Sequence, residues 1–510
     1  MTATDGETSI ESVSDEPTSA PQARGGLLRA ARRHWLFLAI LVAGTGLRVV
    51  VTIAYWPALE FFGDTYEYLA AERTLHPTLW PAGYPIFLRI LSVTGHFGSV
   101  SVVQHILGIG VGVAVYALLV RLGVRPWLAA LGATPVLLDA FQLGIEQFVL
   151  AETLTDALLA AALVLVLWRR RTGAAVGAVV GVLLAVATVT RTAVLPVLAV
   201  VGLYLVLRAQ WRGLAAYVAG CVAVLAAYTS VFGSFGYSGF TGYYLYGRVA
   251  SFARCDRSMS TLERQLCPTQ PVSRRPYVPD YWTWSPGSPI QHANIGGQAA
   301  RNSLGKTFAE YVILHQPLGY AHAVLSDVWH YFTPGRSVGR NGDRVDVMRW
   351  EFPLANLDGD RGLYLNGDLD ALHVYFANVG FGQAVIKASP DPSLMQPLRD
   401  YQSVAYTQGP ILLAALVGAL IVGLRLGRQR ARRRQARWAA LLLSVTGLVL
   451  VVTPSLTTGF SYRYGLPLLV LLPPAGVLAA DLGIDVLMSR WSGRRMVEPD
   501  VSMAYEGGSS

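Results

Sequence analysis

Long apolar segments separated by short polar stretches dominate the chain. A helix needs about 20 apolar residues to cross the hydrocarbon core of a bilayer, which is about 30 Å thick. Segments near that length recur before residue 233 and after residue 406. They lie at 34–55, 98–121, 126–144, 148–168, 174–190, 192–207, 213–232, 407–424, 438–455 and 464–486. The pattern predicts an all-α polytopic membrane protein with about ten transmembrane helices.

The polar stretches divide the chain into five regions. We expect a disordered cytoplasmic tail over 1–33, which is acidic and rich in Ser and Thr, and a second cytoplasmic tail over 487–510. Between them we expect a transmembrane module over 34–232, an outer domain of mixed structure over 233–406, and C-terminal transmembrane helices over 407–486.

The first outer loop, residues 56–97, does not have the pattern of a random coil. Asp64 is placed to cap a short helix over 65–73. A later apolar run, 84–93, is too short to span a bilayer and suits a helix lying in the membrane interface. We therefore expect two interfacial helices, which would hold Asp64 at the outer leaflet.

The composition and the distribution of charge predict how the chain is oriented in the membrane. Of 510 residues, 53% are hydrophobic and 14% are charged, whereas a soluble protein has about 25% charged residues. With ten spans and a cytoplasmic N-terminus, every arginine cluster falls on the cytoplasmic side, as the positive-inside rule requires. The clusters lie at Arg29 to Arg33, Arg121 to Arg125, Arg169 to Arg171, Arg208 to Arg212, 425–437 and 490–495.

The net charge of +9 is therefore explained by membrane orientation and does not indicate a nucleic-acid partner. The basic run before the first span predicts an uncleaved signal anchor. We expect a multi-pass protein of the inner (plasma) membrane whose functional site faces outside.

Two of the three cysteines, Cys255 and Cys267, lie in the outer domain, where oxidising conditions permit a disulfide. Two free thiols are the alternative. Cys221 lies within a span and is explained by apolar packing. The outer domain also contains a predicted helix over 305–332, with a break at Pro317.

Acids near the outer membrane face are the first candidates for chemistry. Asp64 and Glu67 lie in the first loop, and Glu146, Glu152 and Asp156 lie near the outer end of the fourth span. Ionisable groups at membrane depth are costly and are functional candidates by default. The alternatives are a helix cap for Asp64 and a polar tether between helices for Glu152.

Two arginines depart from the cytoplasmic bias in the short loops. Arg191 lies at an outer turn and Arg463 at the start of the last span. A guanidinium can grip a phosphate with two parallel hydrogen bonds. Snorkelling to the interface is the alternative for both residues.

Histidines and aromatic residues of the outer domain give weaker signals. His315, His322 and His330 share a predicted helix, but no tight His, Cys or acid cluster accompanies them, so a divalent metal is unsupported. No phosphate-binding Walker loop, dinucleotide fingerprint or nucleophile elbow is found. Several outer aromatics could stack on sugar rings, although belts and core packing explain them equally well. They are Tyr243, Tyr244, Tyr246, Trp282 and Trp284.

The order of these features resembles the GT-C superfamily of membrane glycosyltransferases. It looks most like the branch of protein O-mannosyltransferases and aminoarabinose transferases, which use a polyprenyl-phosphate sugar. The similar motifs are Gly63 to Tyr68, Leu150 to Leu154, Thr190 to Thr192, His315 to Pro317 and Ser461 to Pro467. The resemblance covers about residues 34–232 and 300–486. Several members have a paired Asp-Glu in the first loop, whereas Thr65 follows Asp64 here.

The resemblance implies a GT-C-like fold and an inverting sugar transfer on the outer face of the membrane. It implies Asp64 as general base, with Glu152 as a second catalytic acid. The donor phosphate would contact Arg463, Arg191 and Tyr464. The acceptor or sugar would contact Glu67, Tyr66, Trp282, Trp284 and His315.

The expected partners are the lipid bilayer, the polyprenyl-phosphate sugar donor and an acceptor that is a glycan, a protein or a lipid. No other cofactor is indicated. We also expect Asp64 and Arg463 to converge around a lipid-accessible hollow. The alternatives are a transporter or lipid flippase, and a non-catalytic relative that scaffolds envelope assembly. The identity of the sugar and of the acceptor does not follow from the sequence.

Overall fold

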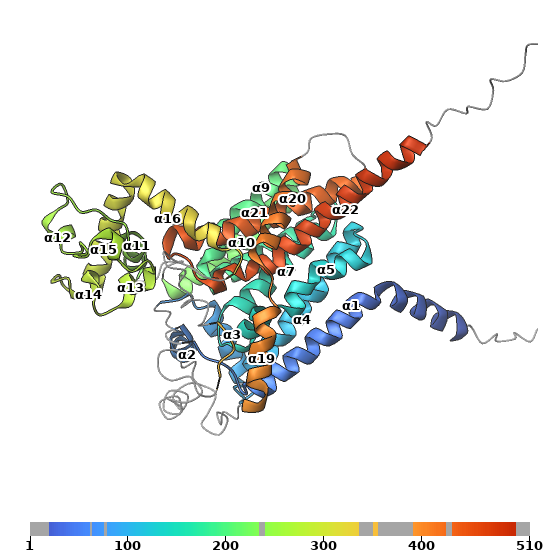
Figure 1. Cartoon of the computed structure of the whole chain (residues 1–510), viewed down its shortest axis with the longest axis horizontal. Coiled ribbons are helices and arrows are strands. Elements are labelled where there is room, and N and C mark those ends of the chain that lie inside the picture. The colour runs from blue at the N-terminus through green and yellow to red at the C-terminus, as the bar shows by residue number, and fades with distance from the viewer. Residues whose placement is uncertain are drawn as a thin grey trace, which may run out of the picture.

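The structure is a computed structural model that describes residues 20–61, 64–75, 79–233, 240–335, 350–354, 391–424 and 431–495. The described residues form helices and loops. Their only β-type pairing is a single parallel bridge between Leu59 and Phe148. A bundle of long helices carries a smaller group of helices beyond one of its ends, connected to it by α16 (Pro317–His330) (Figure 1).

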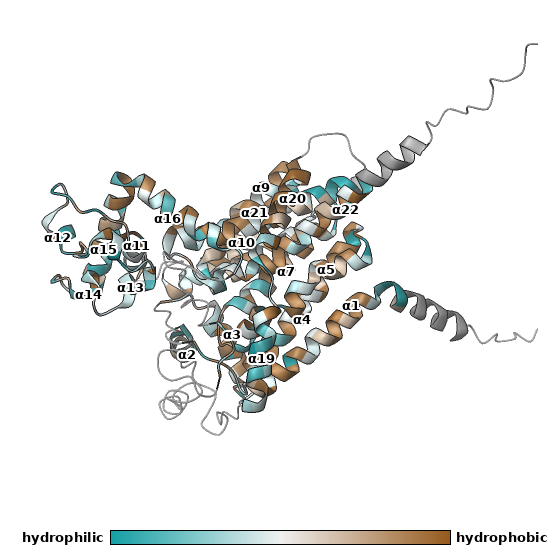
Figure 2. Ribbon diagram, viewed as in Figure 1, coloured by the Kyte–Doolittle hydropathy of each residue, from teal (hydrophilic) through white to brown (hydrophobic). Residues whose placement is uncertain are grey.

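Each predicted apolar segment coincides with a helix or with part of a bent helix pair. The bundle consists of α1 (Ala20–Ala54), α4 (Ser99–Leu122), α5 (Pro126–Leu138), α6 (Ala140–Gln147), α7 (Glu152–Trp168), α8 (Ala174–Thr190), α9 (Leu195–Leu207), α10 (Trp211–Phe232), α20 (Gly409–Leu424), α21 (Ala431–Thr457) and α22 (Pro467–Arg495). Apolar residues dominate these helices, whereas hydrophilic residues are frequent in the group beyond the bundle end (Figure 2).

Five helices of the described residues are long and apolar enough to cross a membrane, and up to seven spans result if each bent pair is one span. The bent pairs are α5 with α6 and α19 (Pro392–Val404) with α20, each bent by 45°. Helices α8 and α9 are apolar but shorter. Multiple spans make this a multi-pass membrane protein.

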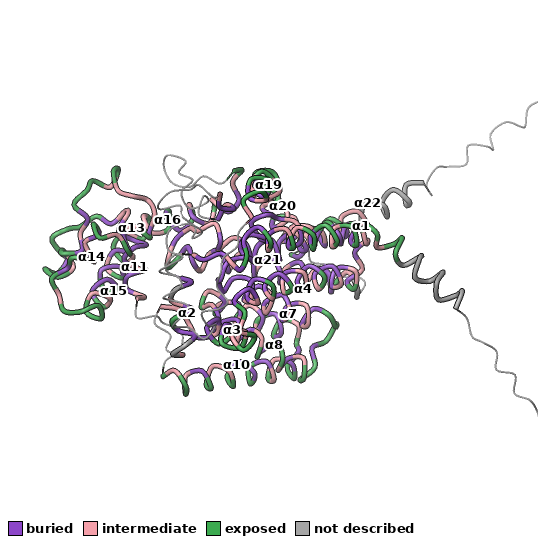
Figure 3. The backbone as a smooth tube through the Cα atoms, turned by 90° about the horizontal axis from the view of Figure 1, so that it is seen from below, coloured by how far each residue is buried: buried purple, intermediate pink, exposed green. Residues whose placement is uncertain are grey.

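Helices α8 and α10 pack closely because glycines remove side chains from their interface. A Cβ atom on Gly177 would lie 2.2 Å from the carbonyl oxygen of Gly213, and one on Gly181 would lie 2.2 Å from that of Tyr217. Small residues four apart allow such close approach of membrane helices. The opposite side of α10 carries exposed residues (Figure 3), as expected of a helix that faces lipid.

Helices extend into both expected tails. Helix α1 begins at Ala20, inside the predicted tail 1–33, because the stretch before the span is rich in Ala, Leu and Arg, which favour helix. Helix α22 likewise continues to Arg495. The remaining parts of both tails lie outside the described residues.

The first outer loop forms the two expected short helices, α2 (Asp64–Thr74) and α3 (Gly83–Ser92). The outer domain contains α11 (Thr241–Ala250), α12 (Thr261–Arg264), α13 (Pro279–Trp284), α14 (Pro289–His292) and α15 (Gln298–His315). The predicted break at Pro317 is confirmed, since α15 ends at His315 and α16 begins at Pro317. The expected mixed structure is not found, because the described part of the domain is helical with loops.

A small core holds the outer domain together. It includes Tyr246, Trp282 and Phe308, which are all buried. The predicted disulfide between Cys255 and Cys267 is confirmed, with sulfurs 2.08 Å apart. Cys221 is a free, buried cysteine within α10, as expected for a packing residue.

Candidate functional site

Charged residues from four distant helix ends meet at one end of the bundle. Asp64 is the first residue of α2, and Arg463 lies on the short 3₁₀ helix η5 (Tyr462–Gly465), just before α22. Their side chains form an ion pair of 2.5 Å. Glu152 begins α7 and lies 3.4 Å from Arg463 and 3.2 Å from Arg191, which follows α8. We refer to these four residues as the acid–arginine cluster.

Aromatic rings surround the guanidinium groups of the cluster. The Arg463 guanidinium lies 5.1 Å from the ring centroids of both Phe61 and Trp350, and Arg191 lies 4.8 Å from that of Tyr464. Such cation–π contacts strengthen when water is excluded. The rings of Phe61 and Trp350 also stack on each other at 4.6 Å. Arg463 is therefore oriented by carboxylates on one side and by aromatic faces on others.

A short segment of the outer region brings Trp350 to the cluster. The side chain of Gln402 on α19 accepts a hydrogen bond from the Phe352 amide and donates one to the Trp350 carbonyl. Arg399 also donates to the Phe352 carbonyl, at 2.6 Å, and Tyr55 donates to the Pro353 carbonyl, at 2.9 Å. Helix α19 thus fixes the ring that covers Arg463.

The environment of Asp64 raises the pKa of its carboxyl. Burial raises the pKa of this carboxyl, Arg463 lowers it, and the nearby carboxylates of Glu152 and Asp280 raise it again, so the pKa lies above the ordinary value. Glu60, four residues earlier, is also buried, and burial raises its pKa to about 8. Neither carboxylate oxygen of Glu60 has a hydrogen-bond partner among the described residues.

Backbone pairing fixes the segment that carries Asp64 against the segment that carries Glu152. The Leu59 amide donates to the Gln147 carbonyl and the Val149 amide donates to the Leu59 carbonyl, both at 2.9 Å. The Thr65 hydroxyl then donates to the Val149 carbonyl at 3.0 Å. The extended strand-like stretch between α6 and α7 therefore sets the position of both acids.

A buried polar centre inside the bundle supports this pairing. Glu146 accepts two hydrogen bonds from Arg48 of α1, both at 2.8 Å, and one from His105 of α4 at 2.9 Å. The other ring nitrogen of His105 lies 2.9 Å from the side-chain oxygen of Gln147. Gln104 donates to the backbone carbonyls of Glu146, at 2.9 Å, and Phe148, at 2.7 Å. All these side chains are buried.

The remaining predicted site residues lie in different surroundings. Glu67 is half-buried on α2, and the Tyr66 side chain lies outside the described residues. Trp282 is 1% exposed and its indole donates to the Pro276 carbonyl, so it is a core residue of the outer domain and is not available to stack on a ligand. His315 is exposed at the end of α15, where its ring stacks on Tyr311. Of the two tryptophans, Trp284 is the exposed one, at 41%.

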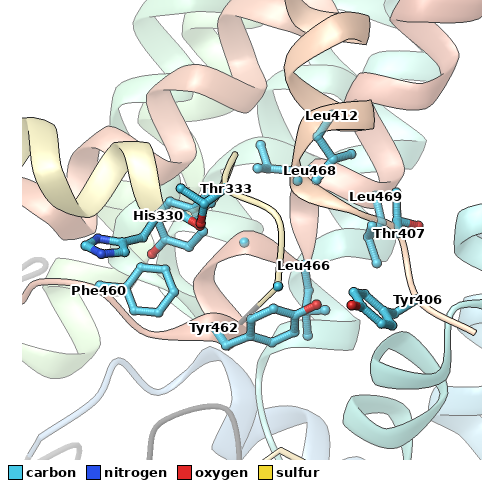
Figure 4. A pocket seen from close by; sticks show the side chains of 14 residues that line it. His330, Thr333, Tyr406, Thr407, Leu412, Phe460, Tyr462, Leu466, Leu468 and Leu469 are labelled. Carbon is cyan, nitrogen blue, oxygen red and sulfur yellow. The ribbon is translucent and has the colours of Figure 1, made fainter. Parts of the chain in front are cut away.

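A pocket that is partly open to solvent adjoins η5. Aromatic and hydroxyl side chains form one part of its lining and leucines form the other; they include His330, Tyr331, Thr333, Tyr406, Phe460, Tyr462, Leu412, Leu466, Leu468 and Leu469. The hydroxyl ends of Tyr406 and Tyr462 point toward each other across it (Figure 4). Neither Asp64 nor Arg463 lines this pocket, because Arg463 is directed to the carboxylates. The expected hollow shared by these two residues therefore stays a prediction.

The acids and histidines of the described residues form no group of three or more that could hold a metal ion.

Sequence reasoning missed Arg48, His105, Asp280 and Trp350. An arginine in the middle of the first apolar segment was itself a signal, because a charge inside a membrane helix requires a buried partner. Trp350 gave no comparable signal, since its position depends on contacts with α19.

Fold and cluster together define a multi-pass helical membrane protein with a buried acid–arginine site at one end of its spans. No family model and no curated protein matches the chain. Among solved structures it is similar to the archaeal oligosaccharyltransferase AglB from Archaeoglobus fulgidus, in complex with an inhibitory peptide and a dolichol-phosphate. The TM-score is 0.39 at 12% identity, over 93% of this chain and 53% of the other. This chain thus spans about half the length of that protein, and a likeness at this level assigns no activity.

Proposed function

We propose that the protein is a membrane glycosyltransferase that moves a hexose or pentose from a polyprenyl-phosphate donor to an acceptor hydroxyl. The observation that carries the proposal is the ion pair between Asp64 and Arg463, with Glu152 and Arg191 beside it. A base and two phosphate-binding cations at a membrane face are the groups that such a reaction requires.

The reaction is a single displacement at the anomeric carbon. The acceptor oxygen forms the new glycosidic bond while the bond from the anomeric carbon to the phosphate oxygen breaks. Asp64 takes the acceptor proton, and polyprenyl phosphate leaves with the bonding electron pair. Arg463 and Arg191 offset the charge that develops on the departing phosphate, and the configuration of the sugar is inverted.

The ion pair gives donor binding a second effect. A donor phosphate that binds Arg463 competes with Asp64 for the Arg463 guanidinium. When Arg463 pairs with the phosphate, it no longer lowers the pKa of Asp64. A carboxylate with a higher pKa is the stronger base. Donor binding would therefore activate Asp64 at the moment it is needed. The leucines of the pocket beside η5 are suited to the first part of the polyprenyl chain.

The ten apolar segments cross the inner (plasma) membrane, with the arginine clusters inside and the cluster at the outer face. This orientation follows the positive-inside rule. It is consistent with a disulfide in the outer domain, because disulfides persist in oxidising compartments. A donor on this side must arrive as a lipid, since nucleotide sugars are cytoplasmic.

The test uses purified protein in proteoliposomes, supplied with radiolabelled polyprenyl-phosphate mannose or polyprenyl-phosphate arabinose and a membrane extract as the source of acceptor. Release of polyprenyl phosphate is measured. Asp64→Asn should lower the rate at least ~100-fold and still bind donor, whereas Asp400→Asn, at an exposed position of α19, should match wild type. Near-normal release by Asp64→Asn, or movement of the labelled lipid across the bilayer without transfer, would contradict the proposal.

A further inference from the structure

A row of aromatic rings runs from the acid–arginine cluster to the exposed surface of the outer domain. It begins at Tyr68 on α2 and continues through Trp80, at 6.4 Å between ring centroids, to Tyr244 on α11, at 6.0 Å. The next ring is Trp284 on α13, at 5.7 Å, and the last is Phe240, at 5.5 Å from Trp284. The row joins the first outer loop to the outer domain.

Tyr244 and Trp284 are not part of the outer domain's core, although Phe240 packs against it. Tyr243, Tyr246 and Trp282 point inward and are 3%, 0% and 1% exposed. Tyr244 is only half-buried, and Trp284 is 41% exposed. Neighbouring residues of α11 and α13 thus divide their aromatic side chains between a packed interior and a face toward the first loop.

Two polar atoms in the row have no hydrogen-bond partner within the described part of the chain. The indole nitrogen of Trp80 and the hydroxyl oxygen of Tyr244 are buried without a hydrogen bond to any described residue. Leaving such a group unsatisfied costs about 1–3 kcal/mol, and buried groups of this kind are normally paired. Two such donors between neighbouring rings therefore indicate a place where a hydroxyl-bearing ligand completes the bonding.

The inner end of the row lies beside Asp64. Burial raises the pKa of the Tyr244 hydroxyl, and the nearby Asp64, Tyr464 and Asp280 raise it further. Tyr68 is influenced by Asp64 and Glu152 in the same way. Tyr68 follows Asp64 by four residues on α2, so the two side chains lie on one face of that helix. A ligand held along the row would therefore present one end to Asp64.

We propose that this aromatic row is the binding site of a carbohydrate acceptor, whose sugar rings stack on Trp284 and Tyr244 and whose hydroxyls bond to Trp80 and Tyr244. A sugar ring combines an apolar face with a rim of hydroxyl donors and acceptors, which matches flat rings bearing unpaired polar atoms. The inference rests on the proposed function and selects a glycan from among a glycan, a protein and a lipid. Asp280 lies one helical turn before Trp284 on α13 and places a negative charge near the site, which suits a neutral sugar better than an anionic lipid headgroup.

The test is isothermal titration calorimetry of the full chain in nanodiscs with two probes, linear α-1,6-mannotetraose and linear α-1,5-arabinotetraose. At least one should bind wild type. Trp284→Ala should weaken that binding at least 10-fold, and Tyr244→Phe, which keeps the ring and removes only the hydroxyl, should weaken it several-fold. Trp329→Ala removes a tryptophan that is 56% exposed on α16 and outside the row, and it should bind as wild type does.

Binding must also survive Asp64→Asn, which separates the two proposals. Loss of transfer with unchanged tetrasaccharide binding in that variant supports both. Tetrasaccharide binding without any release of polyprenyl phosphate by wild type overturns the proposed function alone. The inference is overturned if neither tetrasaccharide binds, if Tyr244→Phe and Trp284→Ala bind as wild type, or if a Ser/Thr-containing peptide displaces the sugar.

Discussion

The guanidinium of Arg463 lies 2.5 Å from the carboxylate of Asp64, although one residue follows the first long helix and the other precedes the last. Both side chains are almost completely enclosed. An enclosed pair loses far more on removal of one partner than an exposed pair does, because the remaining charge is left without compensation.

Arg463→Lys should lower kcat/KM for donor about 10- to 100-fold. Lysine keeps the charge but cannot grip a carboxylate or a phosphate with two parallel bonds, and it stacks less well on Phe61 and Trp350. Steady-state kinetics of donor turnover measure the effect. Arg433→Lys, at an ion pair with Asp485 far along the bundle, serves as the control, and an equal loss in both variants would remove the special role of Arg463.

The pH profile of kcat/KM should show an acidic limb whose apparent pKa lies above 3.8, because burial raises the pKa of Asp64. Activity rises with pH through that limb, since the base must be deprotonated to act. Glu152→Gln should move the limb to lower pH. The substitution removes a negative charge near Asp64, and Arg463 then pairs with the Asp64 carboxylate alone. An unchanged limb, or one moved to higher pH, would show that Asp64 is not the titrating group.

Arg48→Met should destabilise the protein by about 3–5 kcal/mol, because it leaves the Glu146 carboxylate buried and uncompensated. The double variant with Glu146→Leu should recover part of the loss, since both charges are then gone. Thermal unfolding in nanodiscs provides the measurement for a double-mutant cycle. Strictly additive effects would mean that the two residues act separately and do not jointly fix the loop that carries Asp64.

Glu60→Gln should stabilise the protein at neutral and alkaline pH. The folded-state pKa of Glu60, about 8, exceeds that of an unfolded glutamate. The wild-type protein therefore loses stability as the pH rises from the unfolded-state pKa to the folded-state pKa, and above that pH the loss is constant. The gain from the amide should reach at most about 3 kcal/mol at pH 7 and vanish near pH 4. The test is the unfolding midpoint of wild type and variant, measured from acidic to alkaline pH. A gain in stability that does not change with pH would be explained by better packing of the amide and not by the charge of Glu60.

Sequence periodicity was sufficient for the helices and for part of the site. The length of the apolar segments predicts the bundle. The expected position of Asp64, Arg191 and Arg463 at the outer membrane face predicts that these charges lie close together. The contacts of Trp350 could not be predicted in this way, because they depend on how α19 packs beside the first loop. Trp282 and Trp284 show the same limit. They are two residues apart and equally aromatic, yet only the packing of α13 decides which ring is covered.

The parts of the acid–arginine cluster come from the starts of α2 and α7, the end of α8 and the short helix η5 before α22, so no half of the polypeptide contains a complete set. A truncated version, however soluble or well expressed, would lack either Asp64 or the Arg463 guanidinium that pairs with it. Conversely, two separately produced halves would regain activity only by associating within one bilayer. Recovered turnover would then report directly on helix assembly.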